Sequence, residues 1–215
     1  MNRSLNVLRL AMAALLVAIG ILIPAISPVK IPLGPAGSFT LASHVAIFLA
    51  MFFSPLTAVA VSLGTTVGFL LSGFPFPVVL RALSHVVWAV LGALWLKKHP
   101  DILYRPVSSV VFCVVIAVVH ALLETVVIMV LFFSGSVIDQ GGLWLTVFLP
   151  VGVVTLIHSS VDYAVALLVW RPLRSLKSVR SIAVDHQVPR KKPSTIQTSM
   201  AFFALMPAPA PQSGR

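Results

Sequence analysis

Ionisable side chains occur inside the apolar runs of this sequence, and three of those runs carry two such residues four positions apart. The pairs are Arg81 with His85, His120 with Glu124, and His158 with Asp162. In a helix, a spacing of four residues puts both members of a pair on one face. A charge inside a membrane span costs at least about 2.5 kcal/mol on insertion scales. The three faces are therefore expected to point toward one another, as a binding site or as paired structural contacts.

A pocket opening to the outer side of the membrane is one arrangement that these residues predict. The direction in which each run crosses the membrane sets the depth of its side chains. The polar residues expected to gather at the outer side are Arg81, His85, Ser43, His44, Glu124 and His120, with Trp88, Trp144 and Phe39 as aromatic walls. Alternatively, these groups bond only one another and hold the helices together. Asp162 is expected deeper, where a structural contact is favoured over a ligand contact.

Arg81 is the one basic residue inside an apolar run. A guanidinium does not lose its proton in a protein, so it needs an anion nearby. That anion is either Glu124 or the carboxylate of a ligand, and both possibilities remain open at this point.

A metal site is a further alternative, in a different functional class. Two histidines and two carboxylates on facing helices, His120, Glu124, His158 and Asp162, have the chemistry to hold a divalent metal. An intramembrane metal transporter or metalloenzyme would use them. However, the sequence has no His-Glu-x-x-His motif, and Arg81 in the same core would repel a cation. We therefore expect no metal and no cofactor.

The composition requires a lipid environment. The sequence is 59% hydrophobic and only 9% charged, whereas a soluble domain carries roughly a quarter charged residues. The net charge of +10 does not indicate a nucleic-acid partner, because nearly all basic residues lie near the ends of apolar runs or after Trp170. Basic residues at membrane edges set topology and favour anionic lipid.

Six apolar segments predict an all-α integral membrane protein with six transmembrane helices. They are Asn6–Ser27, Ser38–Phe53, Leu56–Ser72, Phe76–Leu96, Val107–Phe133 and Trp144–Trp170. The second is short, and a re-entrant piece is its alternative. If the chain crosses six times with both termini cytoplasmic, Lys30 is the only basic residue flanking a span that faces the outer side. The positive-inside rule favours this arrangement. We expect a membrane domain over 1–180 and a disordered cytoplasmic tail over 181–215.

Several of these features together resemble a known family. Helix one carries Ala14-x-x-x-Ala18, and no Gly-Lys dipeptide occurs, so a Walker A phosphate loop is absent. The run from Ser38 to Pro55 (SFTLASHVAIFLAMFFSP) and the run from Leu80 to His85 (LRALSH) resemble the niacin-specific S component of the energy-coupling-factor vitamin transporters. The resemblance covers about Leu5 to Leu176.

The resemblance implies a mechanism that the residues alone do not. Such subunits are not enzymes; they sit in the bacterial cell membrane and bind a vitamin beneath the loop between helices one and two, here Pro28 to Gly37. They dock through the alanines of helix one, here Ala14 and Ala18, on a membrane scaffold subunit driven by two cytoplasmic ATPases. The implied ligand is nicotinate, with its carboxylate on Arg81. Another small vitamin or heterocycle is the alternative substrate.

Overall fold

The computed structural model describes residues 3–32 and 38–184, without the side chains of Arg3 and Ile31. The expected tail lies almost wholly outside these residues. Four helical stretches are long and apolar enough to cross a membrane: Ser4–Ile26, Phe76–Lys98, Pro106–Phe133 and Trp144–Leu173. They belong to α1 (Arg3–Ile26), α4 (Phe76–Lys98), α5 (Pro106–Phe133), and η3 (Trp144–Val153) continued by α6 (Val154–Leu173). The helical membrane architecture predicted from composition is therefore present.

The expected second span is not one helix. The segment Ser38–Phe53 is divided into a strand, β2 (Ser38–Thr40), a turn, and a nine-residue helix, α2 (Val45–Phe53). Ala42 in the turn has a φ of 68°, a left-handed conformation that no helix continues through. At 1.5 Å per residue, α2 is only about 14 Å long, roughly half the thickness of a bilayer core.

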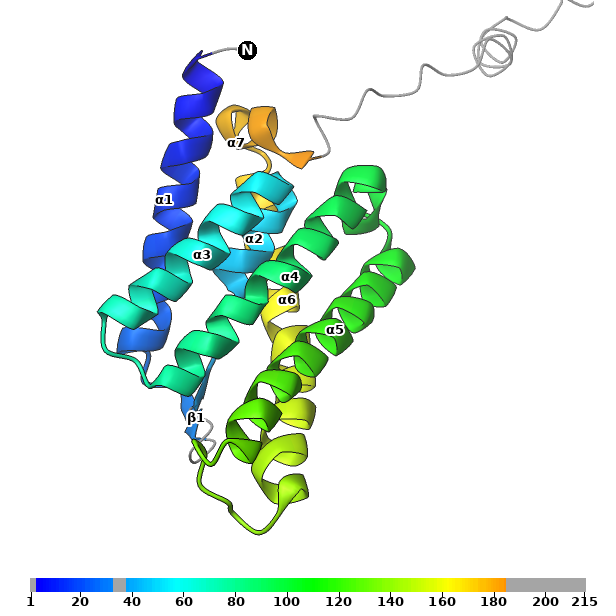
Figure 1. The fold of residues 1–215 in the computed structure, drawn as a ribbon. Helices are drawn as coiled ribbons and strands as arrows, with labels where there is room; N and C mark the ends of the chain where they lie inside the picture. Colours follow the sequence, from blue (N-terminus) through cyan, green and yellow to red (C-terminus); the bar gives the residue numbers. More distant parts are fainter. Residues whose placement is uncertain (1–2, 33–37, 185–215) are drawn as a thin grey trace, which may run out of the picture.

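A two-stranded antiparallel ribbon precedes α2. Strand β1 (Lys30–Pro32) pairs with β2 so that Lys30 lies opposite Thr40. The ribbon closes one end of the helical bundle below α1 and α4 in Figure 1. It therefore covers the end of the bundle at which α2 begins.

All nine residues of α2 are buried, so this helix forms the centre of the molecule. Phe48 packs on Trp88 of α4, with ring centroids 5.1 Å apart, and Phe52 packs on Trp170 of α6 at 5.4 Å. Helix α3 (Pro55–Leu71) begins directly afterwards, where the Ser54 side chain accepts a hydrogen bond from the Thr57 amide. The half-length helix thus sits in an apolar core built by its longer neighbours.

Small residues of α3 bring it close to α1. A side chain added at Gly64 would meet Val17, and one added at Gly68 would meet Ile21. The small residues of α3 therefore pack within the chain. Ala14 and Ala18 lie on a different face of α1 and are exposed.

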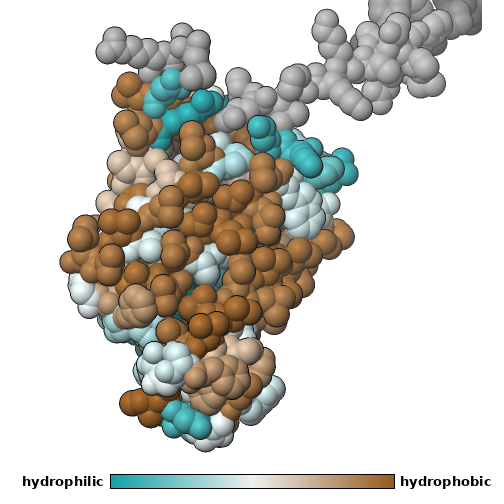
Figure 2. All heavy atoms as spheres, viewed as in Figure 1, coloured by the Kyte–Doolittle hydropathy of each residue, from teal (hydrophilic) through white to brown (hydrophobic). Residues whose placement is uncertain are grey.

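The two ends of the bundle differ in charge. Figure 1 shows the start of α1, the connection between α4 and α5, and α7 (Lys177–Ile182) at one end. The basic residues of these parts and of the segment from the last turn of α6 to α7 are Arg3, Arg9, Lys97, Lys98, Arg105, Arg171, Arg174, Lys177 and Arg180. Apolar side chains cover the middle of the face in Figure 2, as a lipid-facing surface requires. Ile182, Ala183 and Val184 are buried in the core, so ordered packing extends past residue 180.

Candidate functional site

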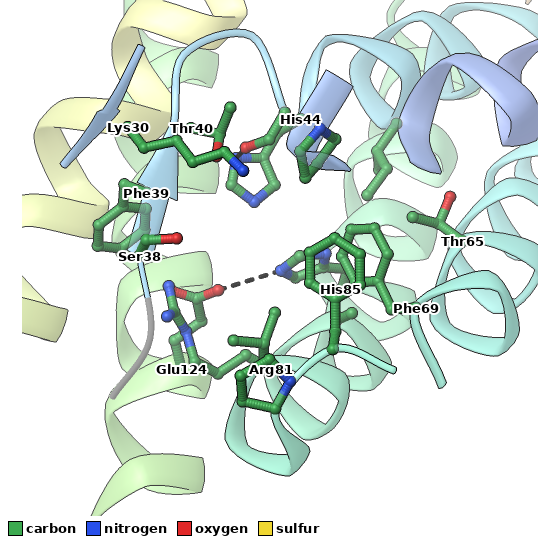
Figure 3. A pocket seen from close by; sticks show the side chains of 17 residues that line it. Lys30, Ser38, Phe39, Thr40, His44, Thr65, Phe69, Arg81, His85 and Glu124 are labelled. Carbon is green, nitrogen blue, oxygen red and sulfur yellow. Dashed lines mark hydrogen bonds and ion pairs between the residues drawn. The ribbon is translucent and has the colours of Figure 1, made fainter. Parts of the chain in front are cut away.

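A cavity of about 410 Å³ lies between the β ribbon, the start of α2, and helices α3, α4 and α5. Its lining combines basic, acidic and aromatic side chains (Figure 3). The lining residues are Pro24, Lys30, Ser38, Phe39, Thr40, Ser43, His44, Ile47, Thr65, Phe69, Phe74, Pro75, Val78, Arg81, Ala82, His85 and Glu124. The volume is at the small end of the range of about 300–1,000 Å³ that ligand pockets occupy. The cavity therefore suits a ligand with one ring rather than an extended molecule.

Glu124 is the centre of the first polar cluster. One oxygen, Oε2, accepts hydrogen bonds from Nη2 of Arg81 at 2.9 Å and from Oγ1 of Thr155 at 2.7 Å. The other oxygen, Oε1, lies 3.1 Å from Nε2 of His85 and 3.3 Å from Nε2 of His120. Side chains of α4, α5 and α6 thus converge on one buried carboxylate, as the spacing of the pairs predicted.

Asp162 is the centre of the second cluster. Its Oδ1 accepts a hydrogen bond from the amide of Ala42 at 2.8 Å, and its Oδ2 accepts one from the amide of His44 at 2.9 Å. Nδ1 of His44 and Nε2 of His158 lie 3.1 and 3.2 Å from Oδ2. The two amides come directly before α2, so Asp162 satisfies backbone donors at the start of this helix and places a negative charge at its positive end. The structural role expected for Asp162 agrees with this geometry.

The four histidines lie against one another between the two carboxylates. The ring of His44 is 4.8 Å from that of His85, 4.6 Å from that of His120 and 5.0 Å from that of His158. Trp88 stacks on His120 at 4.7 Å. The histidines form one connected layer beneath the cavity.

Two basic side chains approach the cavity from different elements. Arg81 of α4 lies over the ring of Phe39, with 4.6 Å between the guanidinium carbon and the ring centroid. Lys30 of β1 lies across from Arg81 in Figure 3, and its Nζ donates a hydrogen bond to the carbonyl of Ala25 at 3.4 Å. Both belong to the lining.

Most of the residues singled out in the sequence meet at this place. Arg81, His85, His44, Ser43 and Glu124 line the cavity, as does Phe39. His120 and Trp88 are fully buried behind its wall.

Trp144 does not meet the others. It lies on η3, is 61% exposed and contacts Phe148 at 6.1 Å. The position at the start of a span gives depth but not the direction in which the side chain points. Of the expected aromatic walls only Phe39 lines the cavity, and Phe69 and Phe74 join it there in place of the two tryptophans.

Other residues of the site were not anticipated. Lys30 reaches the cavity from the ribbon, and the hydroxyl of Ser159 lies 3.2 Å from Nδ1 of His120. A signal for the second was present: Thr155, Ser159 and Asp162 form a polar stripe at helical spacing along α6. No comparable pattern marks Lys30, which follows a turn.

A curated relative connects this geometry with a transport function. The chain is 44% identical over 168 residues to the niacin transporter NiaX of Lactococcus lactis subsp. cremoris (strain MG1363), a match covering 77% of this chain and 74% of that protein. No family model and no solved structure matches the chain. The relative is a transporter and not an enzyme, which confirms the predicted relationship. The chain is a membrane protein and belongs to the family of niacin transporters that includes NiaX.

Proposed function

We propose that this protein is the substrate-binding subunit of a vitamin importer and that it binds nicotinate in the 410 Å³ cavity. The observation that carries the proposal is the lining itself, which sets two cations, Arg81 and Lys30, beside aromatic rings in a space suited to one small ring. A pyridine carboxylate is an aromatic ring with one negative charge. The relationship to a niacin transporter supports the same ligand class.

The orientation of nicotinate follows from where the charges lie. Its carboxylate would face Arg81 and Lys30, since a guanidinium has five donors and can bridge Glu124 and a second carboxylate. Its ring would lie among Phe39, Phe69 and Phe74, and its nitrogen would face the histidine layer, where His85 and His44 line the cavity.

In the proposed topology, the chain crosses the membrane six times and both termini lie in the cytoplasm. The ribbon, the turn and α2 together make the second crossing, and α3 makes the third. The collection of basic residues at the end of the bundle that carries α7 supports a cytoplasmic location for that end. The cavity then opens toward the outside.

The proposed partners are those of the energy-coupling-factor family: a membrane scaffold subunit and two cytoplasmic ATPases. Ala14 and Ala18 are exposed on α1, and small residues allow close approach of another helix. Ala14→Arg or Ala18→Arg should abolish uptake and leave nicotinate binding intact, because the side chains point away from the cavity. Co-purification of either variant with the ATPases at normal yield would show that docking uses another face.

The substrate is tested by comparing nicotinate with nicotinamide, which lacks the negative charge. Calorimetry on the wild type should give much tighter binding of nicotinate. Arg81→Ala should weaken nicotinate by about 2–5 kcal/mol, the range for truncating one partner of a buried charge pair, and should affect nicotinamide far less.

Lys30→Ala is the companion variant, because Lys30 is exposed and its loss leaves the buried network untouched. It should weaken nicotinate by about 0.2–1 kcal/mol, as for exposed ion pairs. Equal wild-type affinity for nicotinate and nicotinamide would contradict the carboxylate contact and favour another heterocycle.

A further inference from the structure

We propose that His44, His85, His120 and Glu124 form a binding site for a divalent transition-metal ion of the zinc class at the floor of the cavity. This inference goes beyond the proposed function and does not depend on nicotinate being the substrate. It rests on the arrangement of ligand atoms, on the partners of the imidazole rings and on the charges of the buried groups.

The four side chains bring their ligand atoms together. One nitrogen of each histidine and one carboxylate oxygen lie within 4.8 Å of one another, and all four residues are buried. Three imidazoles and one carboxylate are a donor set that zinc, cobalt and nickel favour. Zinc–ligand bonds of about 2.0–2.2 Å put the ligand atoms of a tetrahedron about 3.4 Å apart. Side-chain rotations of an ångström or so would therefore close the ligands on an ion.

The partners of two imidazoles leave the correct nitrogen for a metal. Nδ1 of His44 lies 3.1 Å from Oδ2 of Asp162. A carboxylate only accepts, so Nδ1 carries the proton of the neutral ring and Nε2 keeps a lone pair. A carboxylate that holds the far nitrogen of a histidine is the common outer contact of metal-binding imidazoles.

His120 has a hydroxyl in the corresponding place, which can accept a hydrogen bond from Nδ1. Its Nδ1 lies 3.2 Å from Oγ of Ser159, and its buried Nε2 lies 3.3 Å from Oε1 of Glu124, a contact without good hydrogen-bond geometry. The ring is 0% exposed. A buried nitrogen that is held only by a poorly aligned contact is costly, and a metal ion placed between Nε2 and Oε1 would bind both atoms.

Arg81 does not oppose a cation in this geometry. It donates to Oε2 of Glu124, together with Thr155, while Oε1 faces His85 and His120. The arginine thus holds one side of the carboxylate and leaves the other side to the histidines. Among the described residues, the buried polar groups include one guanidinium, that of Arg81, and two carboxylates, those of Glu124 and Asp162. With neutral histidines, Arg81, Glu124 and Asp162 together carry one net negative charge, which a divalent ion would offset.

The test is the metal content of the full chain, purified in detergent with an affinity tag that contains no histidine. After incubation with Zn²⁺ and desalting, elemental analysis by inductively coupled plasma mass spectrometry should find about one zinc ion per chain. His120→Ala should retain less than a tenth of that. Ser159→Ala keeps all four ligands and removes only an outer contact, so it should weaken Zn²⁺ binding about 10–100-fold.

His99→Ala is the matched control, because His99 is exposed in the connection after α4. It should bind as much Zn²⁺ as the wild type. Replacement by Co²⁺ should give a visible absorption band in the wild type and not in His120→Ala. Less than a tenth of an ion per wild-type chain, or equal content in His120→Ala, would overturn the proposal.

If His120→Ala does not fold, the Ser159→Ala titration decides, and unchanged affinity counts against the site. Nicotinate binding measured on the same preparations keeps the two proposals apart. A chain that binds Zn²⁺ but not nicotinate would contradict the proposed substrate alone.

Discussion

Two buried carboxylates organise the polar interior, and they are held by different kinds of partner. Glu124 lines the cavity, and its four partners are side chains from three helices. Asp162 is 0% exposed, does not line the cavity, and accepts from two backbone amides in addition to its two histidines. One carboxylate thus fixes the chain path, while the other arranges side chains that a ligand can reach.

The difference shows how a membrane domain can hold a short helix in its centre. Helix α2 begins inside the protein, where water cannot satisfy its first amides. Asp162 provides the acceptors from α6, more than a hundred residues away in the sequence. The space left at the start of the shortened helix then becomes part of the cavity, with His44 in its wall.

The largest expected effect comes from Asp162→Ala. It removes the acceptor of two buried amides and the charge at the start of α2, so the free energy of unfolding should fall by about 3–5 kcal/mol. Denaturant unfolding in detergent micelles measures this loss.

Asp139→Ala is the control, since Asp139 also accepts from backbone amides, those of Gly141 and Gly142, but lies in an exposed connection. These hydrogen bonds lower the pKa of the Asp139 carboxyl, yet its loss should barely change unfolding. A stable Asp162→Ala variant would mean that α2 does not need this cap.

A smaller and reversible effect is expected from Glu124→Gln. The amide keeps an acceptor for Thr155 and leaves the charge of Arg81 uncompensated beside the cavity, so the unfolding free energy should fall by roughly 1–3 kcal/mol. Because the proposed ligand is an anion that would face Arg81, nicotinate should raise the unfolding temperature more in this variant than in the wild type.

Nicotinamide serves as the control ligand for Glu124→Gln, since it brings no charge to Arg81. It should not restore stability. If nicotinate also fails to do so, and the loss equals that of Asp162→Ala, the two carboxylates are equivalent structural groups and the comparison fails.

The sequence predicted which helices contact one another better than it predicted the path of the chain. The pairs Arg81–His85 and His120–Glu124 placed polar faces on α4 and α5, and the structure confirms that these faces meet. Periodicity indicates which face of a helix is polar, and an arginine inside a span restricts its partner to the few acids available.

Other features had no such signal. The division of Ser38–Phe53 depends on amides of Ala42 and His44 bonded to a distant carboxylate, and hydropathy averaged over a window treats the whole segment as one apolar run. Lys30 reaches the cavity only because the ribbon folds back over it. Trp144 lies on η3, which is wound as a π-helix with Pro150 inside it, so α-helical spacing does not indicate the direction of its side chain.

The smallest expected effect concerns Thr155, which links the two halves of the comparison because it lies on the helix of Asp162 but bonds Glu124. Thr155→Val keeps the shape of the side chain and removes the 2.7 Å hydrogen bond to Oε2. The free energy of unfolding should fall by about 0.5–1.5 kcal/mol. Nicotinate should bind slightly more weakly, because Glu124 then has one hydrogen bond fewer to fix its position. Ser160→Ala on the same helix removes a hydroxyl that bonds the carbonyl of Leu156 and also interacts with Cys113, away from Glu124. It should change neither quantity. Calorimetry and denaturant unfolding on both variants separate the cases. An effect of Thr155→Val no greater than that of Ser160→Ala would show that Arg81 and the histidines alone position Glu124.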